Sequence, residues 1–438
     1  MLIVFIVTVI GGSSAVFAED NDTVGSLQWC YYVGDYNAKE VQTPPVCYNG
    51  YVYTVTQNDG NSYLQRIKEK VSVGEDKKVK NEQIETLAEL KGKLIEYATI
   101  APTVDASAGK IYIPLTGCFA IVPIEGGTPV YVDTDGIYAA GGRQTVSPII
   151  YDSEYIYAGT WGGSSLNSYY RISKSDLTKT VMKEDTGFYW AGACSITLDD
   201  GTGVIFGSDS GNVYLYSNKT NSIIDTLKVE GKVRSSVVSD GKGNYYFSVY
   251  EKYASGYLYK VSVKDSKLVV ADNYPVTLSG GSTCTPVISD GSIYVGTDKN
   301  TIDIFNENGN KSSSAAAPGT VKSLIEIKGN VYAPDNALSG NKGGIIKADG
   351  SEFFMPAESM QQSNIYQIAG NDDGTMLFFK NDSGYLMAIN IEKSGIGDDN
   401  EDPAVPDDGD EAGTADVFVT VTSKGAVNVA QEKVKVKD

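Results

Sequence analysis

The sequence predicts an all-β protein, an eight-bladed β-propeller whose blades are four-stranded antiparallel sheets. Three observations predict this fold. A strand–turn–strand pattern recurs along most of the 438 residues, its copies are about forty to fifty residues apart, and each copy carries an aromatic residue at an equivalent position. Such a period, with several strands in each unit, is typical of a propeller. If the long first unit or the short last unit is divided differently, the number of blades becomes seven.

Residues 285–298 are the clearest copy, with the sequence Thr-Pro-Val-Ile-Ser-Asp-Gly-Ser-Ile-Tyr-Val-Gly-Thr-Asp. Pro286 has no N–H to donate, which suits the first residue of a strand. Asp290 and Gly291 suit a tight hairpin turn, because glycine tolerates a positive φ. Residues 292–297, rich in Ile, Tyr and Val, are expected to form a second strand, and residues 301–306 a third.

The other copies are recognised by an aromatic residue in their second strand. Consecutive aromatic residues of this set are 38 to 59 residues apart in the sequence. The set is Tyr53, Tyr112, Tyr157, Phe206, Tyr246, Tyr294, Tyr332 and Phe378.

The N-terminal part is interpreted as an export signal followed by the start of the propeller. Residues 1–18 hold a short apolar run and end in small residues, as a signal peptide does, although no Lys or Arg precedes the run. We therefore expect a secreted or cell-surface protein with a propeller at residues 24–393. Residues 29–33 are expected to pair with the last blade, because ring closure removes two exposed sheet edges.

Three segments depart from the repeat. Residues 76–83 lie in the longest unit and are expected to be a solvated loop, with a strand favoured over a helical turn for residues 83–90. Residues 394–416 hold nine acidic residues and no Lys or Arg, which is typical of a disordered linker. Residues 417–438 alternate in polarity and are interpreted as the start of a truncated β-rich module.

Composition excludes several function classes. A net charge of −19 argues against nucleic acid as a partner, because phosphate binding needs a basic surface. The chain has no histidine, which excludes Ser-His-Asp and Cys-His catalysis and every histidine metal site. Its five cysteines form no Cys-x-x-Cys motif and are expected to be small buried apolar residues.

The repeat resembles that of the PQQ-like, or quinoprotein-like, propellers, and the resemblance covers roughly residues 29–391. It implies eight four-stranded blades. Quinone-dependent enzymes of that family use adjacent cysteines, a stacking Trp and a calcium ion, and this chain has no adjacent cysteines. We therefore expect no PQQ and no other cofactor. Residues 188–193 and 379–389 also resemble stretches of extracellular propeller proteins of Gram-positive bacteria.

Candidate ligand-binding residues are aromatic and cluster in the third repeat and its exit. Exposed aromatic side chains on propeller loops can stack on sugar rings or clamp a peptide. The alternative is packing between neighbouring blades. The candidates are Trp161, Tyr169, Tyr170, Tyr189 and Trp190.

Arg143 and Arg234 are added because arginine is scarce and both precede repeat strands, near one rim of the channel. They could meet an anionic ligand. Ion pairs within this acidic protein are the favoured alternative. Asp-rich turns such as residues 371–374 are interpreted as turns, with calcium binding as the alternative.

The sequence thus predicts a non-catalytic secreted or cell-surface propeller that serves as a binding or scaffold module for a protein, glycan or small ligand. The alternative is an enzyme that uses the propeller channel, either a quinoprotein-like oxidoreductase or a carboxylate-based glycan-active enzyme. A third interpretation is a spacer that presents downstream domains and associates with the cell envelope through them. No catalytic and no metal-binding residue is assigned.

Overall fold

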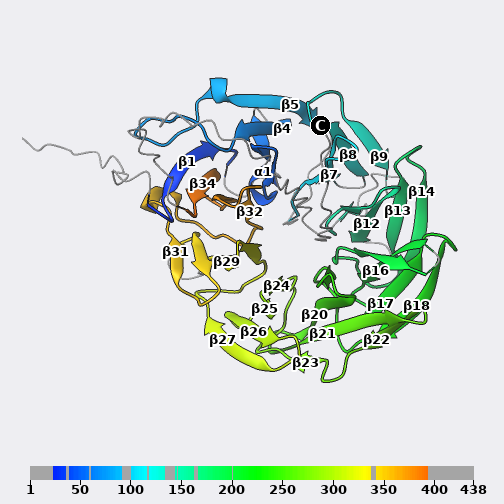
Figure 1. Ribbon diagram of the computed structural model, residues 1–438. Helices are drawn as coiled ribbons and strands as arrows, with labels where there is room; N and C mark the ends of the chain where they lie inside the picture. Colours follow the sequence, from blue (N-terminus) through cyan, green and yellow to red (C-terminus); the bar gives the residue numbers. More distant parts are fainter. Residues whose placement is uncertain are drawn as a thin grey trace, which may run out of the picture.

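The computed structural model describes residues 23–35, 39–58, 61–90, 100–115, 118–133, 144–145, 147–161, 166–199, 201–336 and 342–392. Within these ranges the strands form eight antiparallel sheets arranged as blades around a ring (Figure 1). The eight-bladed propeller is therefore confirmed. The predicted signal peptide (1–18), acidic linker (394–416) and β-rich module (417–438) lie outside the described residues.

In each blade the first strand named is the innermost and the last is the outermost. Blade 1 is β2 (Val46–Tyr48), β3 (Tyr51–Asn58), β4 (Asn61–Lys68) and β5 (Ile84–Leu90); blade 2 is β6 (Thr103–Asp105), β7 (Lys110–Leu115), β8 (Cys118–Pro123) and β9 (Val130–Asp133). Blade 3 is β11 (Ile150–Tyr151) with β10 (Gln144–Thr145), β12 (Tyr155–Trp161), β13 (Asn167–Ser173) and β14 (Lys179–Asp185); blade 4 is β15 (Cys194–Leu198), β16 (Gly201–Gly207), β17 (Asn212–Ser217) and β18 (Ser222–Lys228).

The second half of the ring follows the same plan. Blade 5 is β19 (Val238–Ser239), β20 (Asn244–Lys252), β21 (Ser255–Lys264) and β22 (Lys267–Val270), with β23 (Val276–Thr277) also on β21; blade 6 is β24 (Val287–Ser289), β25 (Ser292–Thr297), β26 (Thr301–Asn306) and β27 (Lys311–Ala316). Blade 7 is β28 (Ile325–Ile327), β29 (Asn330–Pro334), β30 (Ile345–Lys347) and β31 (Glu352–Phe354); blade 8 is β32 (Ala369–Gly370), β33 (Met376–Lys380), β34 (Tyr385–Asn390) and β1 (Leu27–Tyr32).

The described helices are short. They are α1 (Lys39–Gln42), η1 (Asn81–Gln83) and η2 (Glu358–Met360). The described part of the chain contains no helix with the length and hydrophobicity of a membrane span.

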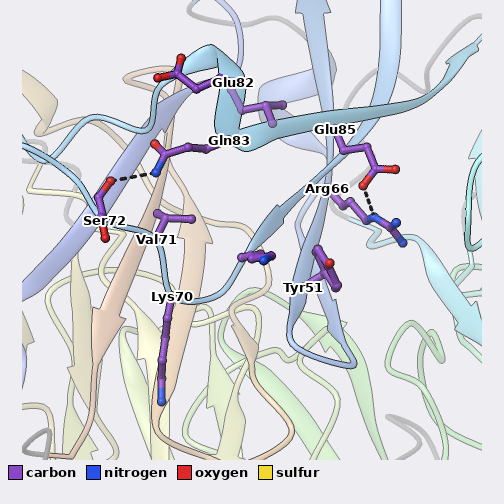
Figure 2. A pocket seen from close by; sticks show the side chains of 10 residues that line it. Tyr51, Arg66, Lys70, Val71, Ser72, Glu82, Gln83 and Glu85 are labelled. Carbon is purple, nitrogen blue, oxygen red and sulfur yellow. Dashed lines mark hydrogen bonds and ion pairs between the residues drawn. The ribbon is translucent and has the colours of Figure 1, made fainter.

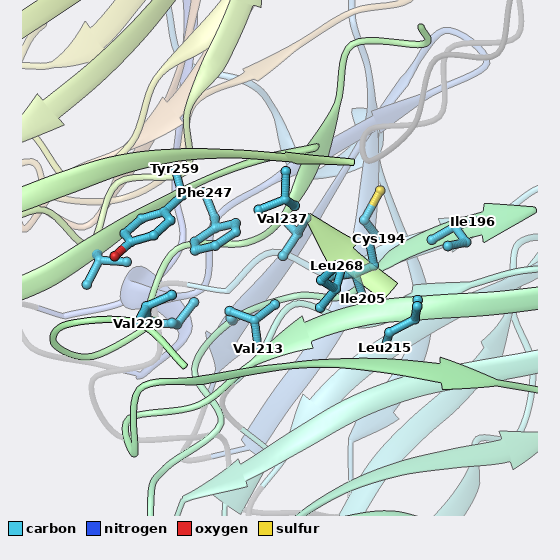
Figure 3. Packing of buried hydrophobic residues seen from close by; sticks show 14 of the residues in the cluster. Cys194, Ile196, Ile205, Val213, Leu215, Val229, Val237, Phe247, Tyr259 and Leu268 are labelled. Atoms are coloured by element: carbon cyan, nitrogen blue, oxygen red, sulfur yellow. The ribbon is translucent and has the colours of Figure 1, made fainter. Parts of the chain in front are cut away.

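The repeated aromatic residues lie on the second strand of every blade, as predicted, and all of them except the half-buried Tyr294 are buried. They belong to apolar clusters that fill the space between neighbouring sheets. Between blades 4 and 5, for example, Val213 and Leu215 pack with Phe247 and Tyr259 (Figure 3). The rings of Phe247 and Tyr259 stack with their centroids 5.2 Å apart. The core is therefore distributed around the ring as a layer between each pair of blades.

Hairpin turns between first and second strands need a left-handed backbone. At Asp290 and Gly291 the φ angles are 46° and 74°, and Asn49–Gly50 and Lys328–Gly329 also have two consecutive positive values. Two such residues are the signature of a type I′ turn, whose twist matches that of the flanking strands. The turn predicted at Asp290 and Gly291 is therefore confirmed.

The ring closes through β1, as predicted from residues 29–33. This N-terminal strand pairs with β34 in antiparallel register, with Trp29 opposite Ala388 and Tyr32 opposite Tyr385. Trp29 is buried, and its Nε1 donates a hydrogen bond to the backbone oxygen of Glu69 in blade 1, at 2.8 Å. The N-terminal strand therefore completes blade 8 and joins it to blade 1.

The long connection between β4 and β5, residues 69–83, is not the free loop that its polar sequence suggests. The Cys30 N–H donates to the Lys77 carbonyl (2.8 Å), and the Val79 N–H donates to the Cys30 carbonyl (3.0 Å). Residues 69–83, called the insertion below, thus run beside β1 and cover its outer edge. An uncovered edge strand can pair with other chains, so this contact protects the closure. The strand predicted after the insertion is β5.

Lys380 connects blade 8 to blade 1 from inside. Its Nζ donates to the backbone oxygens of Glu40 in α1 (2.8 Å) and Val55 in β3 (2.9 Å), and its side chain is fully buried. Burial lowers the pKa of this amine to about 7, against the opposing effect of the Glu40 carboxylate. A neutral amine has two N–H donors, and the carbonyl oxygens of Glu40 and Val55 can accept one hydrogen bond from each.

Replacing Trp29 with Ala should lower the free energy of unfolding by about 3–5 kcal/mol, because it empties a buried site and removes a hydrogen bond across the seam. Replacing Tyr32, on the same strand but 48% exposed, should cost about 1 kcal/mol or less. Urea denaturation measures both. Equal losses would contradict the closure role of Trp29.

The pH dependence of stability should report Lys380. In the unfolded chain Lys380 has the ordinary, higher pKa of a lysine. Between pH 7 and that value the unfolded chain binds a proton that the folded protein does not, so the free energy of unfolding rises with pH in this range. From pH 7 to 9 the wild type should gain up to about 1.4 kcal/mol per pH unit relative to Lys380→Met. The comparison stops at pH 9, because buried cysteines with raised pKa values, such as Cys194, oppose the trend above it. A constant difference between the two proteins would contradict the prediction.

Candidate functional site

The propeller has two faces that differ in their connections. On the front face lie the hairpins between second and third strands and the connections from one blade to the next. On the back face lie the hairpins between first and second strands and the connections between third and fourth strands. The candidate site is on the front face, over blades 3 to 5.

Three half-buried aromatic residues form the aromatic cluster: Trp161 at the end of β12, and Phe188 and Trp190 in the connection from β14 to β15. The ring centroids of Trp161 and Trp190 are 5.7 Å apart, and Phe188 meets both edge-on at 6.0 and 6.4 Å. Ile100 packs against the two Trp rings. Among the described residues the Trp190 Nε1 has no hydrogen-bond partner.

An ion pair lies beside the aromatic cluster. Arg234 donates from Nε and Nη2 to the Asp209 carboxylate, with the shortest contact at 2.6 Å, and the Asp209 side chain is only 6% exposed. The Arg234 guanidinium is also 5.7 Å from the Trp190 ring centroid. The hydrogen bond to Asp209 raises the pKa of Arg234, against burial. The charge of Arg234 is thus compensated within the protein, which was the favoured alternative for this residue.

A hollow of about 250 Å³ opens next to these groups. Phe188 forms its aromatic wall, and a carboxylate, an ammonium group and two hydroxyls complete the lining. The lining residues are Thr186, Gly187, Phe188, Asp209, Ser210 and Lys232. A hollow of this kind offers apolar contact on one side and hydrogen-bonding groups on the other.

Asp185 organises the floor of the site. Its carboxylate accepts hydrogen bonds from the Ser210 hydroxyl, from the Tyr214 hydroxyl at 2.7 Å and from the Gly187 N–H at 3.1 Å. Burial raises the pKa of Asp185, but these hydrogen bonds outweigh burial and hold the pKa well below its usual range. Asp185 therefore stays ionised and positions the backbone on which Phe188 is carried.

Three predicted site residues lie elsewhere. Tyr169, Tyr170 and Tyr189 are fully buried. Tyr169 stacks on Phe206 of blade 4 with centroids 4.2 Å apart, and its hydroxyl accepts from the Ala193 N–H. These three side chains offer no surface to a ligand, and packing between blades, the alternative considered, describes them. Arg143 lies outside the described residues.

Asp209 and Lys232 complete the site and were not singled out in the sequence. Asp209 begins an Asp-Ser-Gly sequence that is typical of a turn, and Gly211 in that turn has a positive φ of 74°. A signal was present, however. Asp209 follows Gly207-Ser208 at the end of a second strand, as Trp161 follows Gly159-Thr160 and Asp298 follows Gly296-Thr297. The three residues hold equivalent positions on the front face, in the repeats of blades 3, 4 and 6.

Metal binding has no support in the described ranges. They contain no group of three or more His, Cys, Asp or Glu side chains placed to hold a metal ion.

Comparisons with known proteins show the fold. No protein-family model and no curated protein matches the chain. The computationally designed protein Ika8, 11% identical, matches with a TM-score of 0.55 over 82% of this chain and 99% of its own. BamB from Moraxella catarrhalis, 10% identical, matches with a TM-score of 0.53 over 83% of this chain and 99% of its own. Membership in the quinoprotein-like family stays a prediction, while the propeller that it implies is confirmed.

Breaking the ion pair of the site should be costly. Arg234→Ala should lower the free energy of unfolding by about 2–4 kcal/mol, because it leaves the Asp209 carboxylate buried and unpaired. Arg234→Ala combined with Asp209→Ala should cost less than the sum of the single changes.

Urea denaturation of the four proteins of this cycle measures the coupling. Lys242→Ala is the control, because it breaks an exposed pair with Glu307 whose partners are 68% and 39% exposed, and should change stability by about 0.5 kcal/mol or less. Additive effects of Arg234 and Asp209 would contradict the coupling.

Proposed function

We propose that this chain is a non-catalytic binding and scaffold propeller of the cell surface or the extracellular space, and that it holds a protein partner on its front face. The observation that carries the proposal is the aromatic cluster of Trp161, Phe188 and Trp190 beside a hollow lined by polar groups. The location rests on the signal peptide predicted for residues 1–18.

The chemistry of the site supports a protein partner. Tryptophan and arginine are the residues most enriched among those that dominate the energy of protein interfaces, and such residues cluster where the surface is well packed. Trp161, Trp190 and Arg234 are held together by ring contacts and by the ion pair with Asp209, so little side-chain entropy is lost on binding. The likeness to BamB shows a shared fold and supports the proposal only at that level.

A glycan is the second candidate, and the hollow beside Phe188 favours it. One aromatic wall with a carboxylate and hydroxyls opposite suits the apolar face and the hydroxyls of a sugar ring. The glycan would contact the hollow, whereas a protein partner would also cover Trp161.

Site-specific photo-crosslinking in the producing cells tests the proposal. A photoreactive residue at Lys232, exposed on the front face, should capture a protein partner. The same residue at Lys264, exposed on the back face, should not. Capture should fall at least about tenfold in a variant with Trp161→Ala and Trp190→Ala.

Circular dichroism of that variant checks that it is folded. Equal capture from both positions, or undiminished capture in the double variant, would contradict a front-face protein site. A glycan that changes the fluorescence of Trp161 and Trp190, without protein capture at Lys232, would favour the second candidate. The third tryptophan, Trp29, is buried and serves as an internal reference.

A further inference from the structure

A second and larger hollow lies on the back face, where blade 1 departs from the repeat. It has a volume of about 590 Å³ and is formed by β3, β4, β5 and the insertion (Figure 2). We call it the insertion hollow. Its lining residues are Tyr51, Arg66, Lys68, Lys70, Val71, Ser72, Glu82, Gln83, Ile84 and Glu85.

The walls of the insertion hollow are held by contacts within the protein. Arg66 donates to Glu85 at 2.8 Å and to Glu125 at 3.0 Å, and its guanidinium lies 4.6 Å from the centroid of the Tyr51 ring. On the other side Gln83 Nε2 donates to the Ser72 carbonyl at 2.8 Å. Figure 2 shows the Arg66–Glu85 and Gln83–Ser72 contacts on opposite sides of the hollow. The charge of Arg66 is therefore compensated.

Lys68 and Lys70 are different. Both line the hollow, both are exposed, and neither makes an ion pair or side-chain hydrogen bond with any residue that the structure describes. Lys174 and Lys311, by contrast, form ion pairs with Asp105 and Asp303. Neither ammonium group of the hollow forms an ion pair with a described residue, although the charge of Lys70 acts on the nearby Glu69 carboxylate.

The lining of the insertion hollow is less acidic than the protein as a whole. It contains three basic residues (Arg66, Lys68 and Lys70) and two acidic residues (Glu82 and Glu85), a balance of 3 − 2 = +1 in a chain of net charge −19. Glu69, which lies between the two lysines in the sequence, is buried and accepts a hydrogen bond from Asn371 at 3.0 Å. A basic patch on an otherwise acidic protein attracts an anionic partner and guides its approach.

We propose that the insertion hollow binds a carboxylate-rich polypeptide segment. The side-chain carboxylates pair with Lys68 and Lys70, and the extended backbone lies over Tyr51, Val71 and Ile84. The hollow lies on the back face and is independent of the function proposed for the front face.

The chain itself carries a segment of this chemistry. Residues 394–416 hold nine carboxylates and no cation. The described chain ends on the back face, where the Ile391 N–H donates to the Thr375 carbonyl at 2.8 Å. Thr375 belongs to the turn between β32 and β33 of blade 8. That turn also contacts blade 1, because the Asn49 N–H donates to the Asp372 carboxylate at 2.8 Å. Ten further residues can extend up to about 35 Å, so this segment, from the same or a second molecule, is a source of the ligand.

Fluorescence anisotropy tests the proposal with a labelled synthetic peptide of sequence 394–416. The receptor is the full-length protein whose nine acids in that segment are changed to the corresponding amides. It should bind the peptide, and Lys68→Glu with Lys70→Glu should weaken binding by roughly tenfold or more. Lys264→Glu with Lys267→Glu, the matched change at another exposed turn of the back face, should change it less than about twofold.

Further binding measurements identify the source and the chemical class of the ligand. Weaker peptide binding by the unaltered protein shows that its own segment competes, and equal binding shows that the segment of a second molecule is bound. The proposal is overturned if the Lys68 and Lys70 variant binds normally, or if a peptide with all acids replaced by amides binds as well. It is also overturned if polygalacturonate binds more tightly per carboxylate than the peptide.

Discussion

Closure of the ring is the constraint on which the rest of this structure depends. An open array of sheets would leave two unpaired edges, and each blade packs only against its neighbours. Here β1 completes blade 8, Trp29 reaches the Glu69 carbonyl of blade 1, and Lys380 joins blade 8 to α1 and β3 from inside. The pairing of β1 with β34 and the two hydrogen bonds of Lys380 connect residues more than 300 positions apart, so closure requires the two ends of the propeller sequence to meet.

Within the closed ring the repeat and its departures have different roles. The repeated aromatic residues, such as Tyr157 and Tyr246, are buried between blades and maintain spacing. The residues at the front-face end of the second strand differ from blade to blade. There blade 3 carries Trp161, whose backbone still pairs with Gln144, and blade 4 carries Asp209, and both residues belong to the candidate site. The proposed recognition site is therefore built from positions at which the repeats differ.

Local physics explains which features the sequence could predict. Type I′ turns, the period of the strands and the missing strand of the last blade follow from short segments or from counting edges. Short segments do not show which residues of an aromatic run are buried. Tyr189 and Trp190 are neighbours in sequence, and only the register between blades places one in the core and the other at the rim. The pairing of Arg234 with Asp209, and of Cys30 with Lys77 and Val79, likewise arises only when distant elements meet.

The two faces of the propeller also differ in how their charges are used, and this has a consequence for recognition. On the front face Arg234 is neutralised by Asp209, so binding there depends mainly on the contact area of Trp161 and Trp190 and should respond weakly to salt. On the back face Lys68 and Lys70 form no ion pair with a described residue, so the ligand proposed for the insertion hollow should be attracted over a longer range and released as ionic strength rises. The two proposed sites should therefore respond differently to the salt concentration.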